Sequence, residues 1–364
     1  MAKIAVIYNA WRKPLALIDM AYIRWIKIAE ALARCGHQVD ILTNEPRWLK
    51  WWNGKKPVQM APNLQRKPIA KTDWSDYDVV KTLFTAGFET LEKYRGQNHP
   101  FIISKLGSVV GPHEMEGIYF YGKVREGFYA SQERITAHSR YITVLSEKAK
   151  ELWVECHGAG EKLLLVPGGV DREIPGPGPN PFPDTNQKVC IFAGNVYNHN
   201  SQPEANAVLV GKLNLLGKML AERGVRLYMF GPGDVSRLDS RYVTYKGIIP
   251  YEASWDYFHH ADVGIVVSAG PFMHNNESTK IYHYLRAGLP YVSEGGFPND
   301  YLARESNLGF VVESGNMELM AEKIVEAAGK DWNRAQAVDY ILNHHTWDKR
   351  VEVYDKLIRQ HFGG

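Results

Sequence analysis

The chain has 364 residues, of which 45% are hydrophobic and 23% are charged, and its formal net charge is +3. This length favours two domains of about 150 to 190 residues, and the composition is typical of a soluble globular protein. The small net charge does not mark the whole chain as a nucleic-acid-binding protein. The three widely spaced cysteines argue against a disulfide framework and against a zinc cluster.

The amino terminus, MAKIAVIYNA, has the pattern of a buried strand rather than that of a signal peptide. No stretch of the sequence approaches the roughly 18 apolar residues that span a bilayer. Isolated cysteines fit a reducing compartment. We therefore expect a cytoplasmic protein, with any membrane contact being peripheral.

In the first half of the chain, apolar runs that predict strands alternate with amphipathic runs that predict helices, which indicates a parallel sheet covered on both faces. The predicted strands are residues 3–8, 39–43, 78–84, 101–106, 141–145 and 162–167. The predicted helices are residues 20–35, residues 118–135 over the cleft, and a helix from about 146 with Ser146 as its N-cap.

Residues 172–187 read REIPGPGPNPFPDTNQ, and this proline-rich composition excludes an interior strand or helix and indicates a linker. The strand–helix pattern then restarts. Its strands are predicted at 188–194, 225–231, 243–249, 262–268 and 290–294, and its helices at 203–223, at 251–260, from 278 and at 345–362. We expect an α/β protein with two doubly wound, Rossmann-like domains, 1–171 and 188–344, which bind ligands where the strands end at a central cleft.

The most informative stretch, residues 277–294, reads ESTKIYHYLRAGLPYVSE. Ser278 and Thr279 are favourable N-cap residues, and a helix N-terminus presents unpaired N–H groups and a partial positive charge to phosphate. Lys280 falls in the first turn, where a cation is unfavourable for the helix unless an anion binds there. The alternative is an ordinary helix–strand connection with a surface lysine.

This stretch, with AGLPYV at its end, resembles the donor-site motif of GT-B glycosyltransferases of the glycogen-synthase-like superfamily. Further segments resemble the family's motifs in the same order: VPGGVD (166–171), FAGNVYNHN (192–200), LYMFGPGD (227–234), YKGIIP (245–250), HADVGIVVS (260–268) and HTWDKRVEVY (345–354). The resemblance covers the whole second domain and the frame of the first. It implies the GT-B fold, in which the C-terminal helix, within 345–364, returns to the first domain.

The resemblance also implies that the second domain binds a nucleotide diphosphate sugar, most readily a UDP-sugar, as substrate and without a cofactor. The residues it assigns to the donor are Gly194 and Asn195 near the phosphates, Gly231, Lys246, Gly247 and Ile248 near the base, Ser278, Thr279 and Lys280 on the diphosphate, and His283 at the ribose. We expect no metal ion, because no Asp-x-Asp pair stands at a strand end. Lys280 would then also act in catalysis, by stabilising the leaving diphosphate.

Two acidic positions of the family motif are replaced. The carboxylate that holds the donor ribose falls at His283, whose neutral ring can still hydrogen-bond a hydroxyl. The companion acid falls at Asn275, and Glu277, two residues away, is a candidate substitute.

The usual cations of the diphosphate site are replaced too. The family's arginine falls at Asn195, and its lysine falls near His199 or Asn200. Lys280 is therefore the obvious replacement, and donor chemistry that differs from that of the family stays open.

In the first domain, the loop at 105–117 reads KLGSVVGPHEMEG and follows a predicted strand. Gly107 and Ser108 would leave room for an acceptor. The candidate acid–base groups are His113, Glu114 and Glu116. Each of these taken singly also fits an ordinary solvated loop residue.

A second candidate catalytic group, Asp19, stands at the opening of the first predicted helix, after YNAWRKPLALID (8–19) in place of the family's glycine-rich loop. An inverting enzyme needs a base to deprotonate the acceptor, whereas a retaining enzyme of this family relies mainly on the donor phosphate. The sequence does not decide between the two.

Residues 44–71 carry seven lysines and arginines against one glutamate, about +6 locally, interleaved with Trp48, Trp51 and Trp52. Such a segment suits an anionic membrane surface, a nucleic acid or an aromatic platform for sugars. The alternative is a solvated loop whose tryptophans pack on the core. The resemblance places the segment, with Trp51 and Trp52, on the acceptor side.

The sequence therefore predicts a glycosyltransferase that acts on a glycan or lipid-linked acceptor hydroxyl. Three alternatives stay open at this point: transfer to hydroxymethylated bases in DNA, as in phage enzymes; a nucleotide-sugar 2-epimerase; and a catalytically degenerate sugar-binding protein.

Overall fold

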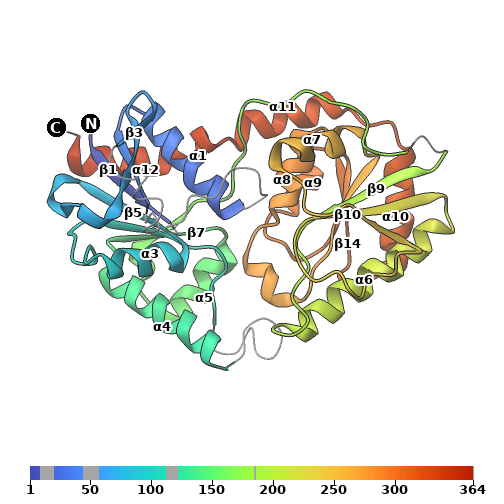
Figure 1. Ribbon diagram of the computed structural model, residues 1–364, viewed down its shortest axis with the longest axis horizontal. Helices are drawn as coiled ribbons and strands as arrows, with labels where there is room; N and C mark the ends of the chain where they lie inside the picture. Colours follow the sequence, from blue (N-terminus) through green and yellow to red (C-terminus); the bar gives the residue numbers. More distant parts are fainter. Residues whose placement is uncertain (9–19, 44–56, 112–121, 184–185, 364) are drawn as a thin grey trace.

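The computed structural model describes residues 1–8, 20–43, 57–111, 122–183 and 186–363. Over these ranges the chain forms two lobes, each built on one sheet with helices on both faces, and both termini lie on the first lobe (Figure 1). None of the helices in these ranges combines the length and the apolar character that crossing a membrane requires.

The first sheet contains eight strands within the described residues. They are β1 (Lys3–Ile7), β2 (Gln38–Thr43), β3 (Val58–Ala61), β4 (Leu64–Pro68), β5 (Val79–Leu83), β6 (Ile102–Lys105), β7 (Tyr141–Val144) and β8 (Leu163–Leu165). Their order is β3-β4-β2-β1-β5-β6-β7-β8, and every pairing is parallel except that of β3 with β4. The strand order reverses between β1 and β5, so this sheet is doubly wound.

Helices cover both faces of the first sheet. One face packs against α1 (Met20–Arg34) and α12 (Trp347–Phe362), which contact each other. The other face packs against α3 (Phe84–Lys93), α4 (Gly122–His138) and α5 (Glu147–His157). Trp347, Val351 and Tyr354 of α12 are buried in the core of the first domain, which confirms that the C-terminal helix returns there.

The second sheet contains six parallel strands within the described residues, in the order β11-β10-β9-β12-β13-β14. They are β9 (Lys188–Ala193), β10 (Val225–Phe230), β11 (Val243–Tyr245), β12 (Val263–Val266), β13 (Tyr291–Glu294) and β14 (Gly309–Val312). The order reverses between β9 and β12, so the loops that follow these two strands diverge and leave a crevice at their carboxyl ends.

Helices α6 (Pro203–Ala221) and α10 (Met317–Gly329) pack together on one face of the second sheet. The opposite face carries α7 (Tyr251–His260), α8 (Thr279–Arg286) and α11 (Arg334–His344), with α9 (Tyr301–Glu305) beside β14. The two doubly wound domains confirm the α/β class predicted from the sequence. The structure adds α9, β14, α10 and α11, which the sequence analysis left unassigned.

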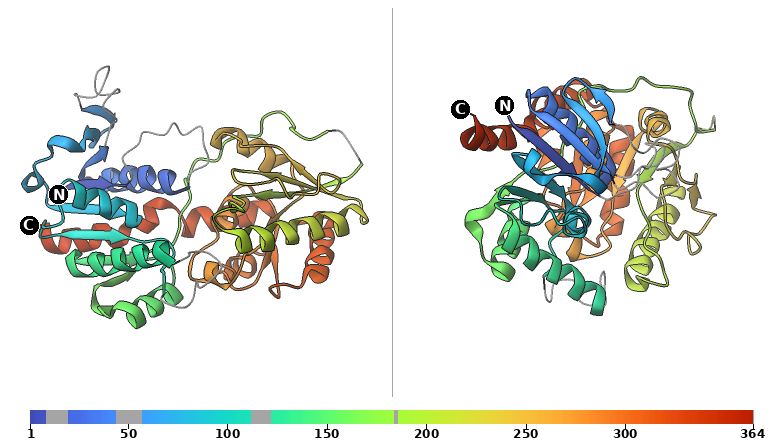
Figure 2. Two further views of the ribbon diagram at one scale, coloured as in Figure 1. Left: turned by 60° about the horizontal axis from the view of Figure 1, so that its bottom comes forward. Right: turned by 60° about the vertical axis from the view of Figure 1, so that its left-hand side comes forward.

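The chain passes between the two domains twice, and the two passages lie side by side (Figure 2). The first is the proline-rich segment after residue 171, which has no helix or strand in its described part. The second leads from α11 into α12. Val170 N–H donates to the His345 carbonyl at 2.9 Å, and Trp347 N–H donates to the Val170 carbonyl at 2.9 Å.

Part of the basic segment 44–71 is regular structure, since β3 and β4 form a hairpin over residues 58–68. The alternative of a solvated loop is therefore wrong for residues 58–68, because β4 pairs with β2 on one side and with β3 on the other. The Lys67 ammonium lies 2.6 Å from the Asp40 carboxylate, which also accepts the Tyr77 hydroxyl. Lys67 is thus neutralised within the domain.

Candidate functional site

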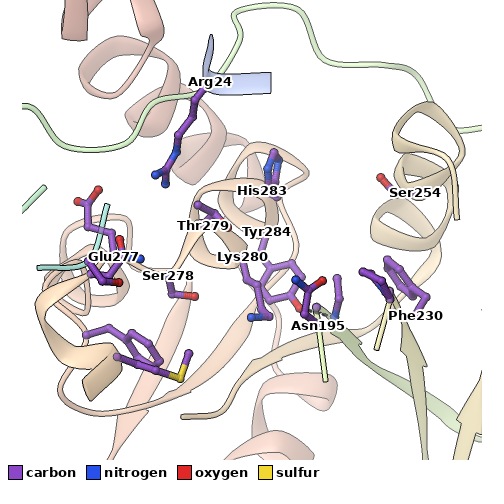
Figure 3. A pocket seen from close by; sticks show the side chains of 18 of the residues that line it. Arg24, Asn195, Phe230, Ser254, Glu277, Ser278, Thr279, Lys280, His283 and Tyr284 are labelled. Carbon is purple, nitrogen blue, oxygen red and sulfur yellow. Dashed lines mark hydrogen bonds between the residues drawn. The ribbon is translucent and has the colours of Figure 1, made fainter. Parts of the chain in front are cut away.

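A cavity of about 670 Å³ lies between the two domains (Figure 3). The second domain lines it with the loops that follow β9 and β10, with α7 and with the start of α8. The first domain contributes Arg24, Phe84 and Ser108. The cavity therefore stands at the carboxyl ends of the strands of both sheets, which is where doubly wound sheets bind ligands.

The loops after β9 and β10 run in direct backbone contact. Gly194 N–H donates to the Phe230 carbonyl at 3.0 Å. Gly231 has a φ of +134°, and a Cβ atom there would overlap the Gly194 carbonyl oxygen. A Cβ atom on Gly194 would lie 2.5 Å from Cε of Lys280. Glycine at 231 therefore permits the close contact of the two loops, and glycine at 194 leaves the room in which the Lys280 side chain lies.

Lys280 presents an ammonium group to the cavity from the first turn of α8. Its Nζ lies 4.9 Å from the centre of the Phe192 ring. No acidic side chain or hydrogen-bond acceptor within the described ranges pairs with this ammonium. Burial lowers the pKa of Lys280 to about 8, so near neutral pH the group is a cation without a counter-ion.

The N-terminus of α8 opens into the same cavity. Ser278 occupies the N-cap position, but its hydroxyl makes no capping hydrogen bond. The residue is only 6% exposed, and Oγ has no hydrogen-bond partner in the described part of the chain. Thr279 also lines the cavity. The helix N-terminus, the Ser278 hydroxyl and the Lys280 ammonium thus lie at one end of the cavity, and groups of these kinds are ones that bind anions.

His283 lies one turn further along α8 and lines the cavity. Its ring stacks on Phe258, with ring centres 6.2 Å apart and planes 6° apart, and meets Tyr251 edge-on. Burial, with the charges of Arg286 and Arg24, lowers the pKa of His283 to about 3. The imidazole is therefore neutral at physiological pH and has the hydrogen-bonding capacity to bind a hydroxyl.

Glu277 lines the cavity, but its carboxylate is engaged in contacts inside the protein. Oε2 accepts the Gly168 N–H at 2.5 Å, and Oε1 accepts the Tyr282 hydroxyl at 2.7 Å. Asn275 is fully buried, and its amide makes two hydrogen bonds to the backbone of Val109. The companion-acid position, Asn275, and its candidate substitute, Glu277, thus both connect the second domain to loops of the first.

Other predicted donor residues are placed differently. Asn195 lines the cavity, but Lys246, Gly247 and Ile248 are not among its described lining residues. Ile248 is 53% exposed, and the Gly247 carbonyl accepts Gly231 N–H at 3.0 Å. Lys246 Nζ lies 5.7 Å from the centre of the Tyr228 ring.

The predicted lysine position near residue 199 also carries no free cation. The His199 ring hydrogen-bonds the Asp234 carboxylate, which the loop after β10 supplies. Asn200 is exposed. Neither residue is among the described lining residues of the cavity.

On the acceptor side, Ser108 lines the cavity and Gly107 packs against Phe84, where an added Cβ atom would lie 3.1 Å from the ring. The remaining candidates lie outside the described residues: Asp19, Trp48, Trp51, Trp52, His113, Glu114 and Glu116. Helix α4 packs against α3 and α5, and none of its described residues lines the cavity.

Sequence analysis missed Arg24. This residue of α1 is only 5% exposed, and its guanidinium points into the cavity (Figure 3). Its Nε finds no acceptor within the described ranges, and burial lowers its pKa. The sequence did contain an indication of its burial, because Arg24 stands four residues before Ile28 and therefore lies on the same inward-facing side of the helix.

Comparison with solved structures gives matches over the full length of the chain. Sucrose-phosphate synthase from Thermosynechococcus elongatus matches with a TM-score of 0.69 and 14% identity over 100% of both chains. HepE from Anabaena in complex with UDP-glucose matches with a TM-score of 0.64 and 14% identity, over 99% of this chain and 100% of HepE. The chain has the GT-B fold.

A further GT-B structure, the E. coli trehalose-6-phosphate protein bound with UDP-2-fluoro glucose, matches with a TM-score of 0.66 and 11% identity over 98% of this chain and 99% of that one. By sequence, no protein-family model and no curated protein gives a significant match. Likeness at this level of identity shows the GT-B fold, so the activity has to be argued from the cavity itself.

Proposed function

We propose that this protein transfers a sugar from a nucleotide diphosphate sugar, preferably a UDP-sugar, to an acceptor hydroxyl. One observation carries the proposal: the unpaired Lys280 ammonium stands beside the open N-terminus of α8 in the cavity between the domains. A diphosphate supplies the negative charge that this arrangement lacks. The named UDP and UDP-sugar complexes of the similar structures support uracil as the base.

In the proposed reaction, the bond between the sugar and the diphosphate breaks while the acceptor oxygen bonds to the sugar, and the proton of the acceptor hydroxyl passes to the leaving diphosphate or to solvent. Negative charge then builds up on the leaving diphosphate. Lys280, Ser278 Oγ and the first N–H groups of α8 are already in place to stabilise this charge. Removing one such preorganised donor typically lowers kcat by about 10²–10³. No metal ion is required in this scheme.

The nucleoside part of the donor would extend along α8. The neutral His283 ring would hydrogen-bond the ribose hydroxyls, as its place in the cavity and its lowered pKa support. The base would lie between the loop at Gly231 and Pro232 and helix α7, since these elements form that end of the cavity.

The acceptor would enter from the first domain, past Ser108 and Phe84. We propose a glycan or lipid-linked acceptor, with the protein located in the cytoplasm or peripherally at a membrane. The described part of the basic segment does not favour DNA in particular, because Lys67 is paired with Asp40.

A panel of UDP-, GDP- and ADP-sugars tests the proposal, with nucleotide release measured with and without a mixture of glycan acceptors. We expect release of UDP from at least one UDP-sugar, faster when an acceptor hydroxyl is present. Formation of an epimerised free sugar, without any dependence on acceptor, would indicate a 2-epimerase instead. UDP binding without turnover of any donor would indicate a sugar-binding protein.

A further inference from the structure

Arg24 is a buried cation that the described structure leaves without an anion. The side chain is 5% exposed, and Nε has no acceptor among the described residues. Glu277 is the nearby acid whose charge acts on Arg24, but both of its oxygens already accept hydrogen bonds, from Gly168 and Tyr282. An arginine that is desolvated without a partner destabilises the free protein, so its position calls for a ligand.

The guanidinium faces the first turn of α8. Figure 3 shows Arg24 descending from α1 toward the space between Glu277 and His283. Electrostatic coupling agrees with this position, because the charge of Arg24 contributes to lowering the pKa of His283. Arg24 therefore stands over the same helix start as Ser278 and Lys280, but it belongs to the other domain.

The charged side chains that line the cavity favour a ligand with more than one negative charge. Within the described residues, the lining contains two cationic side chains, Arg24 and Lys280, and one carboxylate, Glu277, which is internally hydrogen-bonded. The diphosphate of a nucleotide sugar carries a negative charge on each phosphate and gains another when the sugar leaves. Two cations and a helix N-terminus balance these negative charges better than Lys280 does alone.

We propose that Arg24 is the second cation of the diphosphate site, so that the donor is bound by Arg24 of the first domain and Lys280 of the second. This inference rests on the proposed function and adds a residue to it. The planar guanidinium can donate two parallel hydrogen bonds to phosphate oxygens. Because the two cations come from different domains, the bound diphosphate links α1 to α8 across the cavity.

The test is calorimetric titration of the full-length protein with uridine, UMP and UDP. The variants are Arg24→Met, Arg24→Lys and the control Arg34→Met. Arg34 lies on the same helix, pairs with Asp348 at 2.7 Å and is about half exposed. We expect Arg24→Met to weaken UDP binding by about ten- to a hundredfold, with uridine affinity unchanged. Arg24→Lys should retain part of the UDP affinity. Arg34→Met should change neither the UDP affinity nor the uridine affinity.

Thermal unfolding of the ligand-free variants separates ligand binding from a structural role. Arg24→Met should melt at or above the wild-type temperature, because it removes a buried charge that lacks a partner. A lower melting temperature together with unchanged UDP affinity would show that Arg24 only supports the fold, and would overturn the proposal.

Three further results would overturn the role of Arg24. If Arg24→Met leaves UDP affinity unchanged but raises the KM for the acceptor, the guanidinium binds an anionic group of the acceptor. If Lys280→Met loses UDP binding while Arg24→Met keeps it, the proposed function stands and the role of Arg24 falls. If the wild-type protein binds none of the nucleotides, both proposals fall together.

Discussion

The Glu277 carboxylate accepts the backbone N–H of Gly168 at 2.5 Å, across the boundary between the two domains. Glu277 immediately precedes the N-cap of α8, and Gly168 belongs to the loop that follows the last strand of the first sheet. The same carboxylate accepts the Tyr282 hydroxyl from within α8. The start of α8 is therefore held in place by the other domain.

Replacing Glu277 with alanine should destabilise the protein. The change leaves the Gly168 N–H and the Tyr282 hydroxyl buried without an acceptor, which should lower the free energy of unfolding by about 2–4 kcal/mol. Urea unfolding followed by tryptophan fluorescence measures this. Glu318→Ala, which removes a half-exposed carboxylate paired with Arg223, serves as the control and should change stability by less than about 1 kcal/mol. Equal effects of the two changes would refute the interdomain role.

UDP affinity should depend on pH through Lys280. The pKa of Lys280 in the free protein is about 8, lowered by burial. The protonated form binds the anion, so affinity is highest below pH 8 and should fall as pH rises through 8, by up to about tenfold per pH unit. Titration calorimetry between pH 6.5 and 9.5 measures this change in UDP affinity. His283 does not titrate within this window, because its pKa is near 3.

Lys280→Arg provides the matched control for this pH dependence. Arginine stays charged throughout the range, so its UDP affinity should be nearly flat between pH 6.5 and 9.5, even if it is lower overall. If the variant shows the same slope as the wild type, another group is responsible for the pH dependence.

His283 should be sensitive to the hydroxyls of the donor ribose. His283→Gln retains a hydrogen-bonding side chain, whereas His283→Ala does not, so the glutamine variant should keep more UDP affinity. Wild-type protein should bind UDP about five- to twentyfold more tightly than its 2′,3′-dideoxy analogue, because the analogue lacks the hydroxyls that would make one or two neutral hydrogen bonds. This ratio should fall toward one in His283→Ala. An unchanged ratio would remove the ribose role.

The contact between the loops of Gly194 and Gly231 should not tolerate a side chain. Gly231→Ala places a methyl group against the Gly194 carbonyl oxygen at a φ of +134°. Either the loops separate or the domain loses stability, and donor KM should rise at least about tenfold, since small displacements of a binding site are costly. Gly224 also has a positive φ, of +74°, but its surroundings are open. Gly224→Ala should therefore leave KM unchanged, and equal KM values for the two variants would contradict the close-contact argument.

Periodicity made most of the fold predictable. Buried runs such as residues 3–8 and 188–194 became β1 and β9, because a parallel strand that is covered on both faces needs continuous apolar residues. Ser146 caps α5 as predicted and accepts Ala149 N–H at 3.0 Å. The hairpin of β3 and β4 was missed because its polar outer-strand sequence has no continuous apolar run.

The site was predictable only in part, for a physical reason. Ser278, Lys280 and His283 belong to one short sequence motif at the start of α8, so they line the cavity together and were predictable together. Arg24 reaches the cavity only through tertiary packing of α1, and local pattern does not encode that contact. The partners of Glu277 are likewise set by packing, since the Gly168 loop belongs to the other domain.

The measurement that tests the central claim most directly compares wild type with Lys280→Met, in UDP affinity and in turnover of the preferred UDP-sugar. Methionine keeps the apolar stem beside Phe192 and removes only the charge. We predict that kcat/KM falls by about a hundredfold or more and that UDP affinity falls with it, while the free energy of unfolding does not decrease. Full activity and unchanged UDP affinity in Lys280→Met would contradict the assignment of this cavity as a nucleotide-sugar site.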